Sequence, residues 1–436
     1  MKFRGLLIAA LVLLVLGGVL YWSEHRKPAE EHPNSTANAS PVIVKLDPPT
    51  IAKLTFKKRD TAPVTLVRKD ANDWQITEPK PLDADQNAVS TMLLPLSSLN
   101  SERVVEDRAA DLKQYGLEQP ALELDFTEKN NKSQQLRMGD DTPTGGSTYA
   151  MLAGDPRVFT ISSSDKASLD KTVNDLRDKH LLKLQTEKIS RIDLVRKNQE
   201  IKFGRDKNGW QILKPRPLRA DSIQIDELVT KLTDAKMDLS GIGTQDSAGD
   251  FARATPVTVA KVTGDAGTQE LQIRKSKDLY YAKSSVIDGT YKVDSDLGQA
   301  LDKSLDDFRN KKLFDFSFNQ PNKIELHDGS KSYVLTRSGQ DWFSEGKKVD
   351  AGKMESLISK LRDLTAAKFP NSGFTTPQII AAVTSQDGKL VEKVLIAKSG
   401  DGYIAKRENE PSLYQFDAST VDGLQKAVDT LPSAGK

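Results

Sequence analysis

Hydrophobic and polar positions alternate in the same order in three stretches of the chain. In each stretch, two alternating segments flank a polar turn, and a second turn leads into a segment that carries Trp74, Trp210 or Trp342. Alternation with a period of two is typical of β-strands with one buried face, and short polar turns join antiparallel neighbours. The pattern therefore predicts a three-stranded antiparallel meander in each stretch.

An amphipathic helix is predicted after each meander. Asp85, Asp221 and Asp350 stand where an N-cap residue is needed, and Pro95 is expected to kink or shorten the first helix. Apolar residues follow each aspartate at the spacing of one helix face. They are Val89, Met92, Leu93 and Leu96; Ile225, Leu228, Val229 and Leu232; and Met354, Leu357, Ile358 and Leu361.

The second half of each stretch recurs as well. Pro120, Pro256 and Pro377 each precede an alternating segment, and further strands are expected to form β-hairpins. A closing helix is expected to end the first two stretches in the segments 175–184 and 307–316, which read DLRDKHLLKL and DFRNKKLFDF.

Three tandem modules follow from this threefold pattern. We place the first module at residues 46–184, the second at 185–318 and the third, more diverged, at 319–436. Each combines an antiparallel meander, a helix, β-hairpins and a closing helix, so the predicted fold class is α+β.

An apolar run near the N-terminus predicts a membrane anchor. Residues 5–22 carry no charge, and as a helix they would span about 27 Å, close to the thickness of the hydrocarbon layer. Lys2 and Arg4 favour a cytoplasmic start. We therefore expect a cytoplasmic tip and transmembrane helix at 1–22 and a flexible linker at 23–45.

The alternative for this run is a cleaved signal peptide. A small-x-small cleavage site should follow the apolar run closely, but the nearest one is Ala37–Ala39. An uncleaved anchor would make the chain a single-pass membrane protein, with its N-terminus in the cytoplasm and its C-terminal body outside the cytoplasm.

Charge and composition narrow the classes of function. Lys and Arg number 63 and Asp and Glu 61, and Lys2 with Arg4 account for the net charge of +2. This even balance argues against nucleic-acid binding, which needs a clustered basic surface. The chain has no cysteine, which excludes disulfides, iron–sulfur clusters, thiolate zinc sites and a cysteine nucleophile.

Three segments come near known catalytic or binding motifs without matching them. Residues 138–147 are rich in glycine but lack the spacing and the lysine of a phosphate loop. Ser168 and Lys171 have Ser-x-x-Lys spacing, but the partner motifs of that site are missing. Residues 83–87 begin like a calcium loop but lack its glycine and its final glutamate, so we interpret them as a helix cap.

Histidines and paired acids give no stronger candidate. The adjacent acids Asp140 and Asp141, and Asp306 and Asp307, are interpreted as solvated residues. None of the four histidines has a ligand at metal-binding spacing. They are His25, His32, His180 and His327. The sequence therefore predicts no catalytic, cofactor-binding or metal-ligating residue and no cofactor.

The motifs of the modules resemble those of a bacterial family, domain of unknown function 4340. The resemblance lies in W-x-I-x-x-P-x-P-x-x-A-D at 74–85 and 210–221, in YGL-x-x-P at 115–120, and in L-R-D/N-K at 176–179, with Phe for Leu at 308–311. In the third module the two prolines are missing, and Asp350 follows its tryptophan by eight residues rather than eleven.

The resemblance implies a bacterial inner-membrane protein that is often encoded near ABC transport systems of the gliding-motility type. We therefore expect a non-enzymatic, membrane-tethered scaffold or accessory protein of the cell envelope, with the membrane bound through residues 5–22 and a membrane transport complex as partner. Two alternatives stay open. One is an envelope glycan- or peptidoglycan-binding module, which predicts exposed tryptophans, and the other is a hydrolase with an unrecognised carboxylate pair in a concave pocket.

Overall fold

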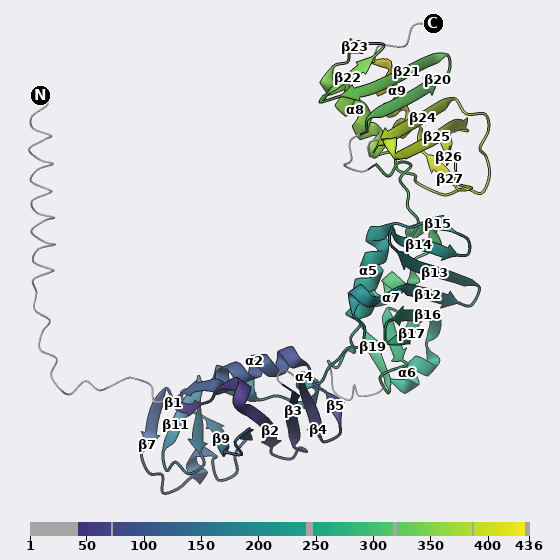
Figure 1. Ribbon diagram of the computed structural model, residues 1–436. Helices are drawn as coiled ribbons and strands as arrows, with labels where there is room; N and C mark the ends of the chain where they lie inside the picture. Colours follow the sequence, from purple (N-terminus) through teal and green to yellow (C-terminus); the bar gives the residue numbers. More distant parts are fainter. Residues whose placement is uncertain (1–41, 71–72, 241–246, 317–320, 386–387, 432–436) are drawn as a thin grey trace, which may run out of the picture. The chain divides into compact units, whose positions relative to one another are not determined.

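The computed structural model describes residues 42–70, 73–240, 247–316, 321–385 and 388–431 (Figure 1). They form two compact units, of which unit 1 ends at Asp178 and unit 2 begins at Lys179. The fold is mostly β, so the predicted α+β class is wrong: the described strands form four antiparallel sheets of two, nine, eight and eight strands. The prediction underestimated the strands because the second half of each module is a full meander.

Unit 1 contains a nine-stranded sheet in the order β5-β4-β3-β2-β8-β9-β10-β11-β7 and a two-stranded sheet of β1 and β6. Its elements are β1 (Val42–Lys45), β2 (Ile51–Lys58), β3 (Val64–Asp70), β4 (Asp73–Glu78), β5 (Leu82–Asp83), α2 (Gln86–Ser97), β6 (Ser98–Asn100), β7 (Arg103–Glu106), β8 (Leu122–Glu128), β9 (Ser133–Asp141), β10 (Ser147–Leu152), β11 (Val158–Ser162), α3 (Ser163–Leu169) and α4 (Val173–Leu176).

Unit 2 contains the two eight-stranded sheets. The first is built from β12 (Arg191–Arg196), β13 (Gln199–Asp206), β14 (Gly209–Lys214), β15 (Leu218–Arg219), α5 (Ser222–Thr233), α6 (Ala248–Arg253), β16 (Thr255–Gly264), β17 (Gly267–Ser276), β18 (Leu279–Ser284), β19 (Thr290–Val293) and α7 (Ser295–Asp302). The second is built from β20 (Lys323–Asp328), β21 (Lys331–Ser338), β22 (Asp341–Ser344), β23 (Lys347–Lys348), α8 (Ala351–Arg362), β24 (Ile379–Ser385), β25 (Leu390–Ser399), β26 (Gly402–Arg407), β27 (Leu413–Phe416) and α9 (Ala418–Asp429).

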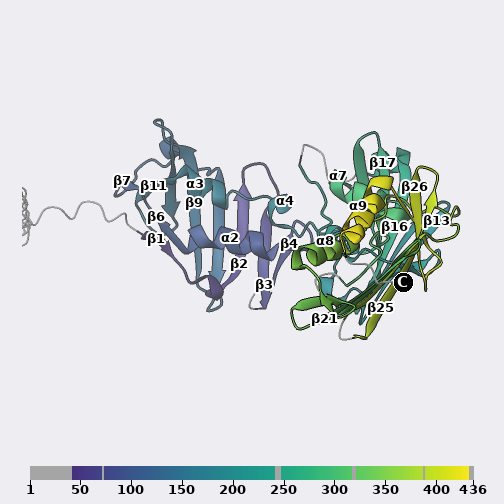
Figure 2. The same cartoon turned by 90° about the horizontal axis from the view of Figure 1, so that it is seen from above.

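Each eight-stranded sheet consists of two four-stranded meanders that meet through their first strands. The orders are β15-β14-β13-β12-β16-β17-β18-β19 and β23-β22-β21-β20-β24-β25-β26-β27, so β12 pairs with β16 and β20 with β24. A helix follows each meander, and the two helices of a sheet pack against each other, as α8 and α9 do in Figure 2. Each sheet therefore repeats one strand-rich pattern twice.

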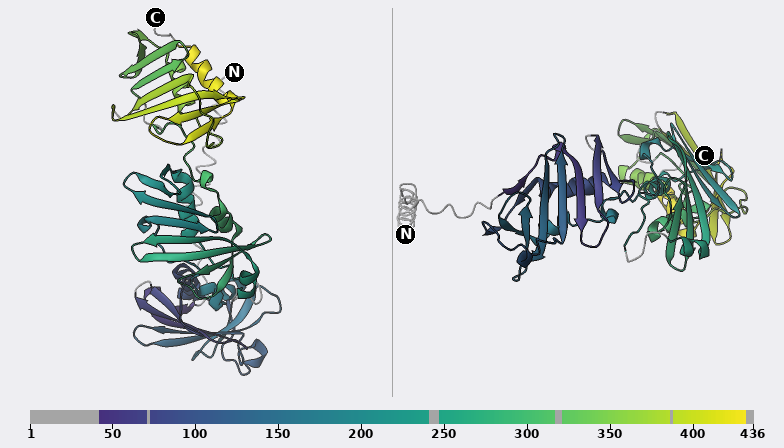
Figure 3. Two further views of the ribbon diagram at one scale, coloured as in Figure 1. Left: turned by 90° about the vertical axis from the view of Figure 1, so that its right-hand side faces the viewer. Right: turned by 90° about the horizontal axis from the view of Figure 1, so that it is seen from below.

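The helices cover one face of each sheet and leave most of the other face to solvent. Along β12, buried Ile192 and Leu194 alternate with Arg191 and Asp193 on the opposite face. Figure 3 (left) looks onto the strands of unit 2. In the second module, α6 covers a small part of the second face, where Phe251 packs with Ala254 and Tyr281. We call the largely solvent-facing side of each sheet its open face.

The predicted helix caps are confirmed. The Asp85 carboxylate accepts hydrogen bonds from the backbone N–H groups that open α2, and Asp221 and Asp350 do the same for α5 and α8. Of the prediction that Pro95 would kink or shorten its helix, the shortening is wrong, since α2, α5 and α8 have 12 residues each. Pro95 lies in the last turn of α2, and the helix ends two residues after it.

The expected helix ends at 175–184 and 307–316 are also wrong, because most of each segment is extended. The helices α3 and α7 end earlier, and only α4 and a short 3₁₀ turn at Leu305–Asp307 enter these segments. We call residues 176–184 the first connecting segment and residues 308–316 the second. Each segment contributes apolar side chains to two different cores. A helix would gather these side chains on one face instead of separating them along the chain.

The membrane anchor receives no support from the structure. Among the described residues, no helix is long and apolar enough to cross a membrane. The predicted anchor at 5–22 and the first part of the predicted linker lie outside the described residues. The predicted single-pass inner-membrane location is therefore not supported. The module boundaries stay a prediction.

Candidate functional site

The second connecting segment joins two hydrophobic cores of unit 2. Phe308 is buried in the core of the second module, whereas Leu313, Phe314 and Phe316 are buried in the core of the third. All four side chains are at most 2% exposed. The segment therefore contributes to both sides of the junction rather than acting as a free linker.

Backbone hydrogen bonds hold each end of this segment. Toward the second module, Asp221 N–H donates to Phe308 O at 2.8 Å and Asn310 N–H donates to Arg219 O at 3.0 Å. Toward the third module, Leu313 N–H donates to Leu364 O at 3.1 Å and Ala366 N–H donates to Lys311 O at 2.9 Å. Each of these bonds pairs a backbone N–H with a backbone C=O, and either group would cost free energy if it were buried without a partner.

The first connecting segment repeats this pattern within each unit. In unit 1, Asp85 N–H donates to Leu176 O at 2.8 Å. In unit 2, Leu181 N–H donates to Ala235 O at 2.7 Å, and Leu181 and Leu182 are buried in the core of the second module. The L-R-D/N-K motif found in the sequence therefore marks a recurring structural element.

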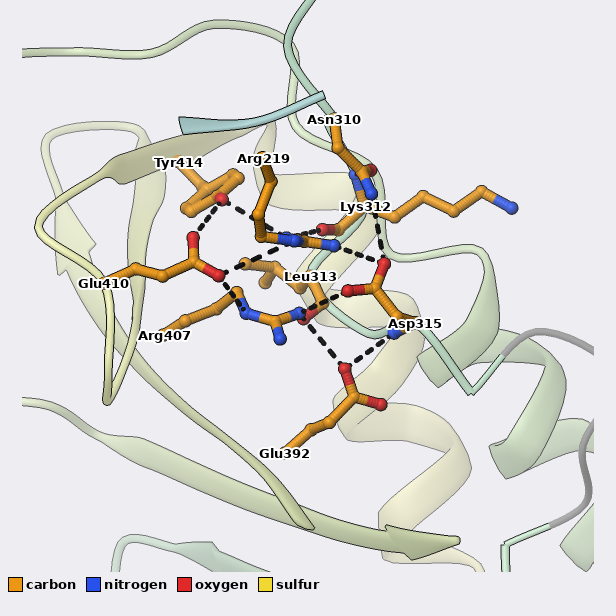
Figure 4. A network of polar contacts seen from close by, with 9 residues as sticks. All are labelled: Arg219, Asn310, Lys312, Leu313, Asp315, Glu392, Arg407, Glu410 and Tyr414. Atoms are coloured by element: carbon orange, nitrogen blue, oxygen red, sulfur yellow. Dashed lines mark hydrogen bonds and ion pairs between the residues drawn. The ribbon is translucent and has the colours of Figure 1, made fainter. Parts of the chain in front are cut away.

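A network of charged side chains surrounds the second connecting segment (Figure 4). Arg219 on β15 forms an ion pair with Asp315, and its Nε lies 3.5 Å from Glu410 Oε1. Its Nη1 donates to Lys312 O at 2.8 Å and to the Tyr414 hydroxyl at 3.3 Å. One arginine from the second module thus reaches the connecting segment and the third module at once.

Arg407 on β26 is the second cation of this network. Its Nη1 donates to Leu313 O at 2.5 Å and lies 3.1 Å from Glu392 Oε1 and 3.4 Å from Asp315 Oδ2. Its Nε lies 2.7 Å from Glu410 Oε1. A guanidinium has five N–H donors in a fixed plane, so it can bind several acceptors at defined angles. We call Arg219, Asp315, Glu392, Arg407, Glu410 and Tyr414 the junction network.

Burial changes the proton affinity of two members. It raises the pKa of Glu392, against the opposing effects of the Asp315 N–H and of Arg407, which favour the charged carboxylate. It also raises the pKa of Tyr414 to about 12, so that this hydroxyl stays protonated and donates to Glu410 Oε2 at 2.8 Å. The network is therefore held by charge pairing and hydrogen bonds in a partly buried setting.

The junction network is built from arginine, carboxyl and tyrosine side chains. It contains no serine or histidine, and no group of three or more potential metal ligands occurs in the part of the chain that the structure describes. A pair of arginines placed between three carboxylates and two main-chain oxygens is suited to fixing two modules to one segment.

The acidic pairs considered from the sequence serve local structure. Asp141 accepts from Thr148 Oγ1 at 2.6 Å and from Lys166 Nζ at 2.9 Å, and both contacts lower its pKa. Asp306 pairs with Arg309 at 3.0 Å, and Asp307 accepts from Ser304 at the start of a 3₁₀ turn. The two members of each pair therefore do not form a shared acid–base site.

The other candidates also have structural roles. Lys171 Nζ donates to the main-chain oxygen of Ala167 at 3.2 Å. Lys57 on β2 pairs with Glu123 at 2.8 Å and Asp125 at 2.6 Å. His327 Nδ1 lies 2.8 Å from Ser332 Oγ.

The tryptophans and the remaining histidines were also candidate site residues. The three tryptophans of the modules are 2%, 4% and 6% exposed, so they are core residues and not stacking platforms. His180 lies in the first connecting segment, where its backbone forms an isolated β-bridge with Lys236. His25 and His32 lie outside the described residues.

The junction network was not predicted from the sequence, although two signals of it were present there. Arg219 stands where the first module has Asp83 in an otherwise matching motif. Glu392 lies at an inward position of an alternating strand, in line with Val394 and Ile396. A charged residue at an inward strand position needs a partner, and this requirement was a recognisable signal.

Comparison with known proteins supports the repeated architecture. The family described as Domain of unknown function (DUF4340) matches at residues 74–250 and again at 210–379. The two matches begin at Trp74 and Trp210, the equivalent residues of the first two modules. No curated protein and no solved structure matches the chain. Since the matches cover well over half of the sequence, the chain belongs to the family of domain of unknown function 4340.

Proposed function

We propose that this protein is a non-enzymatic scaffold that binds partner proteins on the open faces of its sheets. The observation that carries the proposal is that the helices pack on one face of each sheet and leave most of the other face to solvent. An eight-stranded face that is not needed for the core is available for a partner.

The open face of the second module is a ladder of alternating charges. Glu200 lies between Lys202 at 2.8 Å and Lys214 at 2.9 Å, and Asp193 lies between Arg191 at 2.8 Å and Lys202 at 3.6 Å. Exposed ion pairs of this kind contribute little to stability. Such a ladder therefore suits the selection of a charged partner better than the stabilisation of the sheet.

The open face of the third module is less charged. Val391 is 58% exposed and Val334 is 40% exposed on strands of that face. Lys323 pairs with Glu325 at 2.8 Å there, and Lys393 pairs with Glu408 at 2.6 Å. Because the faces differ in chemistry, the scaffold would bind different surfaces through different modules. An ABC-type transport complex is the partner implied by the family resemblance alone.

The test is cross-linking of the tagged full-length protein in cells, followed by mass spectrometry of the attached proteins. A matched pair of charge-reversal variants, Lys202→Glu on the open face and Lys236→Glu outside it, separates face-specific binding from general charge effects. The proposal expects one set of partners to be lost with Lys202→Glu and kept with Lys236→Glu. Recovery of the protein alone, or equal partner sets for both variants, contradicts it.

A second candidate function is glycan binding, which one observation favours. A polar pocket of about 460 Å³ lies on the open face of unit 1, lined by hydroxyl, amide and charged side chains. The lining residues include Lys53, Thr55, Asp125, Thr127 and Gln135. The version of this hypothesis that relied on exposed tryptophans is wrong. Calorimetric titration with cell-wall glycan fragments would show binding that Thr127→Val weakens, and no heat of binding would eliminate this candidate.

A further inference from the structure

Glu392 occupies a position where the second module has a glutamine. Gln269 on β17 is buried, and it uses both ends of its amide on one residue of the first connecting segment. Its Oε1 accepts from Lys183 N–H at 2.8 Å, and its Nε2 donates to Lys183 O at 2.7 Å. The amide side chain therefore holds the connecting segment against the sheet with a donor and an acceptor.

Glu392 on β25 makes the equivalent contact with the second connecting segment. Its Oε1 accepts from Asp315 N–H at 2.7 Å, as Gln269 accepts from Lys183. Lys183 and Asp315 each lie two residues after a leucine of their connecting segment. The main-chain oxygen of that leucine, Leu181 or Leu313, accepts a hydrogen bond from a side chain of the neighbouring strand. The two contacts are therefore copies of one structural feature.

The two side-chain end groups differ at one atom, and Glu392 Oε1 also accepts from Arg407 at 3.1 Å. Where Gln269 has the Nε2 donor, Glu392 has Oε2, which is buried and has no hydrogen-bond partner among the described residues. An ionised carboxylate could only accept there, whereas the equivalent position in the second module requires a donor to a main-chain oxygen. A protonated carboxyl has an O–H donor, so it reproduces the hydrogen-bonding pattern of the amide.

The surrounding charges agree with one bound proton. Arg407 from β26 and Arg219 from β15 supply two positive charges, and Asp315 from the connecting segment, Glu410 from the β26–β27 loop and Glu392 are the three carboxyls. Tyr414 from β27 is neutral. The Glu392 side chain is 1% exposed, compared with 41% for Asp315 and 20% for Glu410, so Glu392 loses the most hydration when charged.

We propose that Glu392 carries a proton in the folded protein, donates from Oε2 to the main-chain oxygen of Asp315, and makes this contact a pH-sensitive latch on the second connecting segment. When the proton leaves to water, an acceptor faces an acceptor and the latch weakens. Burial raises the pKa of Glu392, which agrees with this assignment. The latch therefore holds in mild acid and loosens as the pH rises through the pKa of the folded state.

The first test is difference infrared spectroscopy of the full-length protein at neutral pH. A protonated carboxylic acid has a carbonyl stretch that is separate from carboxylate bands. We expect this band in the unaltered protein, its loss in Glu392→Gln, and its retention in the matched variant Glu408→Gln, whose carboxyl pairs with Lys393 outside the junction network. Absence of the band from the unaltered protein, or its retention in Glu392→Gln, overturns the proposal.

The second test addresses the latch itself through hydrogen exchange. The Asp315 amide donates to Glu392 Oε1, so its protection from exchange reports on the latch. Between about pH 5 and about pH 8, this protection should fall by at least about tenfold more in the unaltered protein than in Glu392→Gln. The factor follows because one unit of pKa shift equals a tenfold change in an equilibrium constant. An equal change in both proteins overturns the latch. If Glu392→Gln does not fold, titration of ¹³C-labelled glutamate carboxyls in the unaltered protein decides, because a Glu392 resonance with an ordinary pKa contradicts the proposal.

Discussion

Exchanging the chemistry of the two junctions tests how the connecting segments are held. Gln269→Glu places a carboxyl where the second module has an amide, at a site that is 8% exposed. In the second module the neutral Ser284 stands in the place of Arg407 as the donor to the leucine carbonyl, so the new carboxyl lacks the positive charge that this arginine gives to Glu392. The substitution should therefore be more costly here than at the second junction.

The magnitude follows from two routes open to the new carboxyl. If it stays charged, the bond of 2.7 Å from Gln269 Nε2 to Lys183 O is lost and a buried carboxylate faces that oxygen. If it binds a proton, keeping a group of ordinary pKa near 4.3 protonated at pH 7 costs about 3.7 kcal/mol. The protein takes the cheaper route, so we expect a loss of about 2–4 kcal/mol in the free energy of unfolding of unit 2 at pH 7.

The sign of the pH dependence is fixed by the same argument. A buried carboxyl has a raised pKa in the folded state, so the folded protein binds more protons than the unfolded chain between the two pKa values. The destabilisation should therefore be small near pH 4.5 and grow as the pH rises through the folded pKa. Urea unfolding followed by the fluorescence of Trp210, the buried tryptophan of the second module, measures it.

A matched variant separates burial from charge. Gln199→Glu makes the same chemical change at an exposed position of the same module, and it should alter stability by less than about 0.5 kcal/mol at any of these pH values. Equal losses for the two variants, or a loss for Gln269→Glu that does not depend on pH, would refute the reasoning.

Three other predictions concern single residues of unit 2. Asp221→Ala should remove the cap of α5 and cost about 1 kcal/mol in urea unfolding, with no effect if the cap is not formed in solution. Gly298→Ala should destabilise by about 2 kcal/mol because its Cβ would lie 2.2 Å from Tyr280 Cδ1, whereas Gly423→Ala, with its nearest neighbour at 3.9 Å, should be neutral or stabilising. The Glu200 carboxyl should titrate with a pKa of about 2 in NMR, because Lys202 and Lys214 donate hydrogen bonds to its charged form. Any stability that it adds should be lost only as the pH falls through that value. An ordinary pKa would show that these ion pairs do not persist.

The sequence predicted the parts of the fold that local patterns determine. The meander strands, the tryptophans and the caps at Asp85, Asp221 and Asp350 depend on neighbours within a few residues, and the structure has them where the pattern placed them. The connecting segments were misread because Leu181 and Leu313 follow helical apolar residues and continue their spacing. Their extended form depends on pairing with residues such as Ala235 and Leu364, which lie about fifty residues further along the chain.

The junction network was beyond the reach of local patterns for a related reason. Its members lie between positions 219 and 414, and each is an ordinary charged or aromatic residue by composition. A comparison of the second and third modules position by position would have shown Glu392 in place of Gln269. The pairing of Glu392 with Asp315 and Arg407 needed the packed structure.

The placement of the connecting segments has a practical consequence for dividing this protein into fragments. A fragment that starts at residue 319 would lack Leu313, Phe314 and Phe316, three large side chains of the core that it is meant to preserve. Removing even one such side chain typically costs about 2–5 kcal/mol.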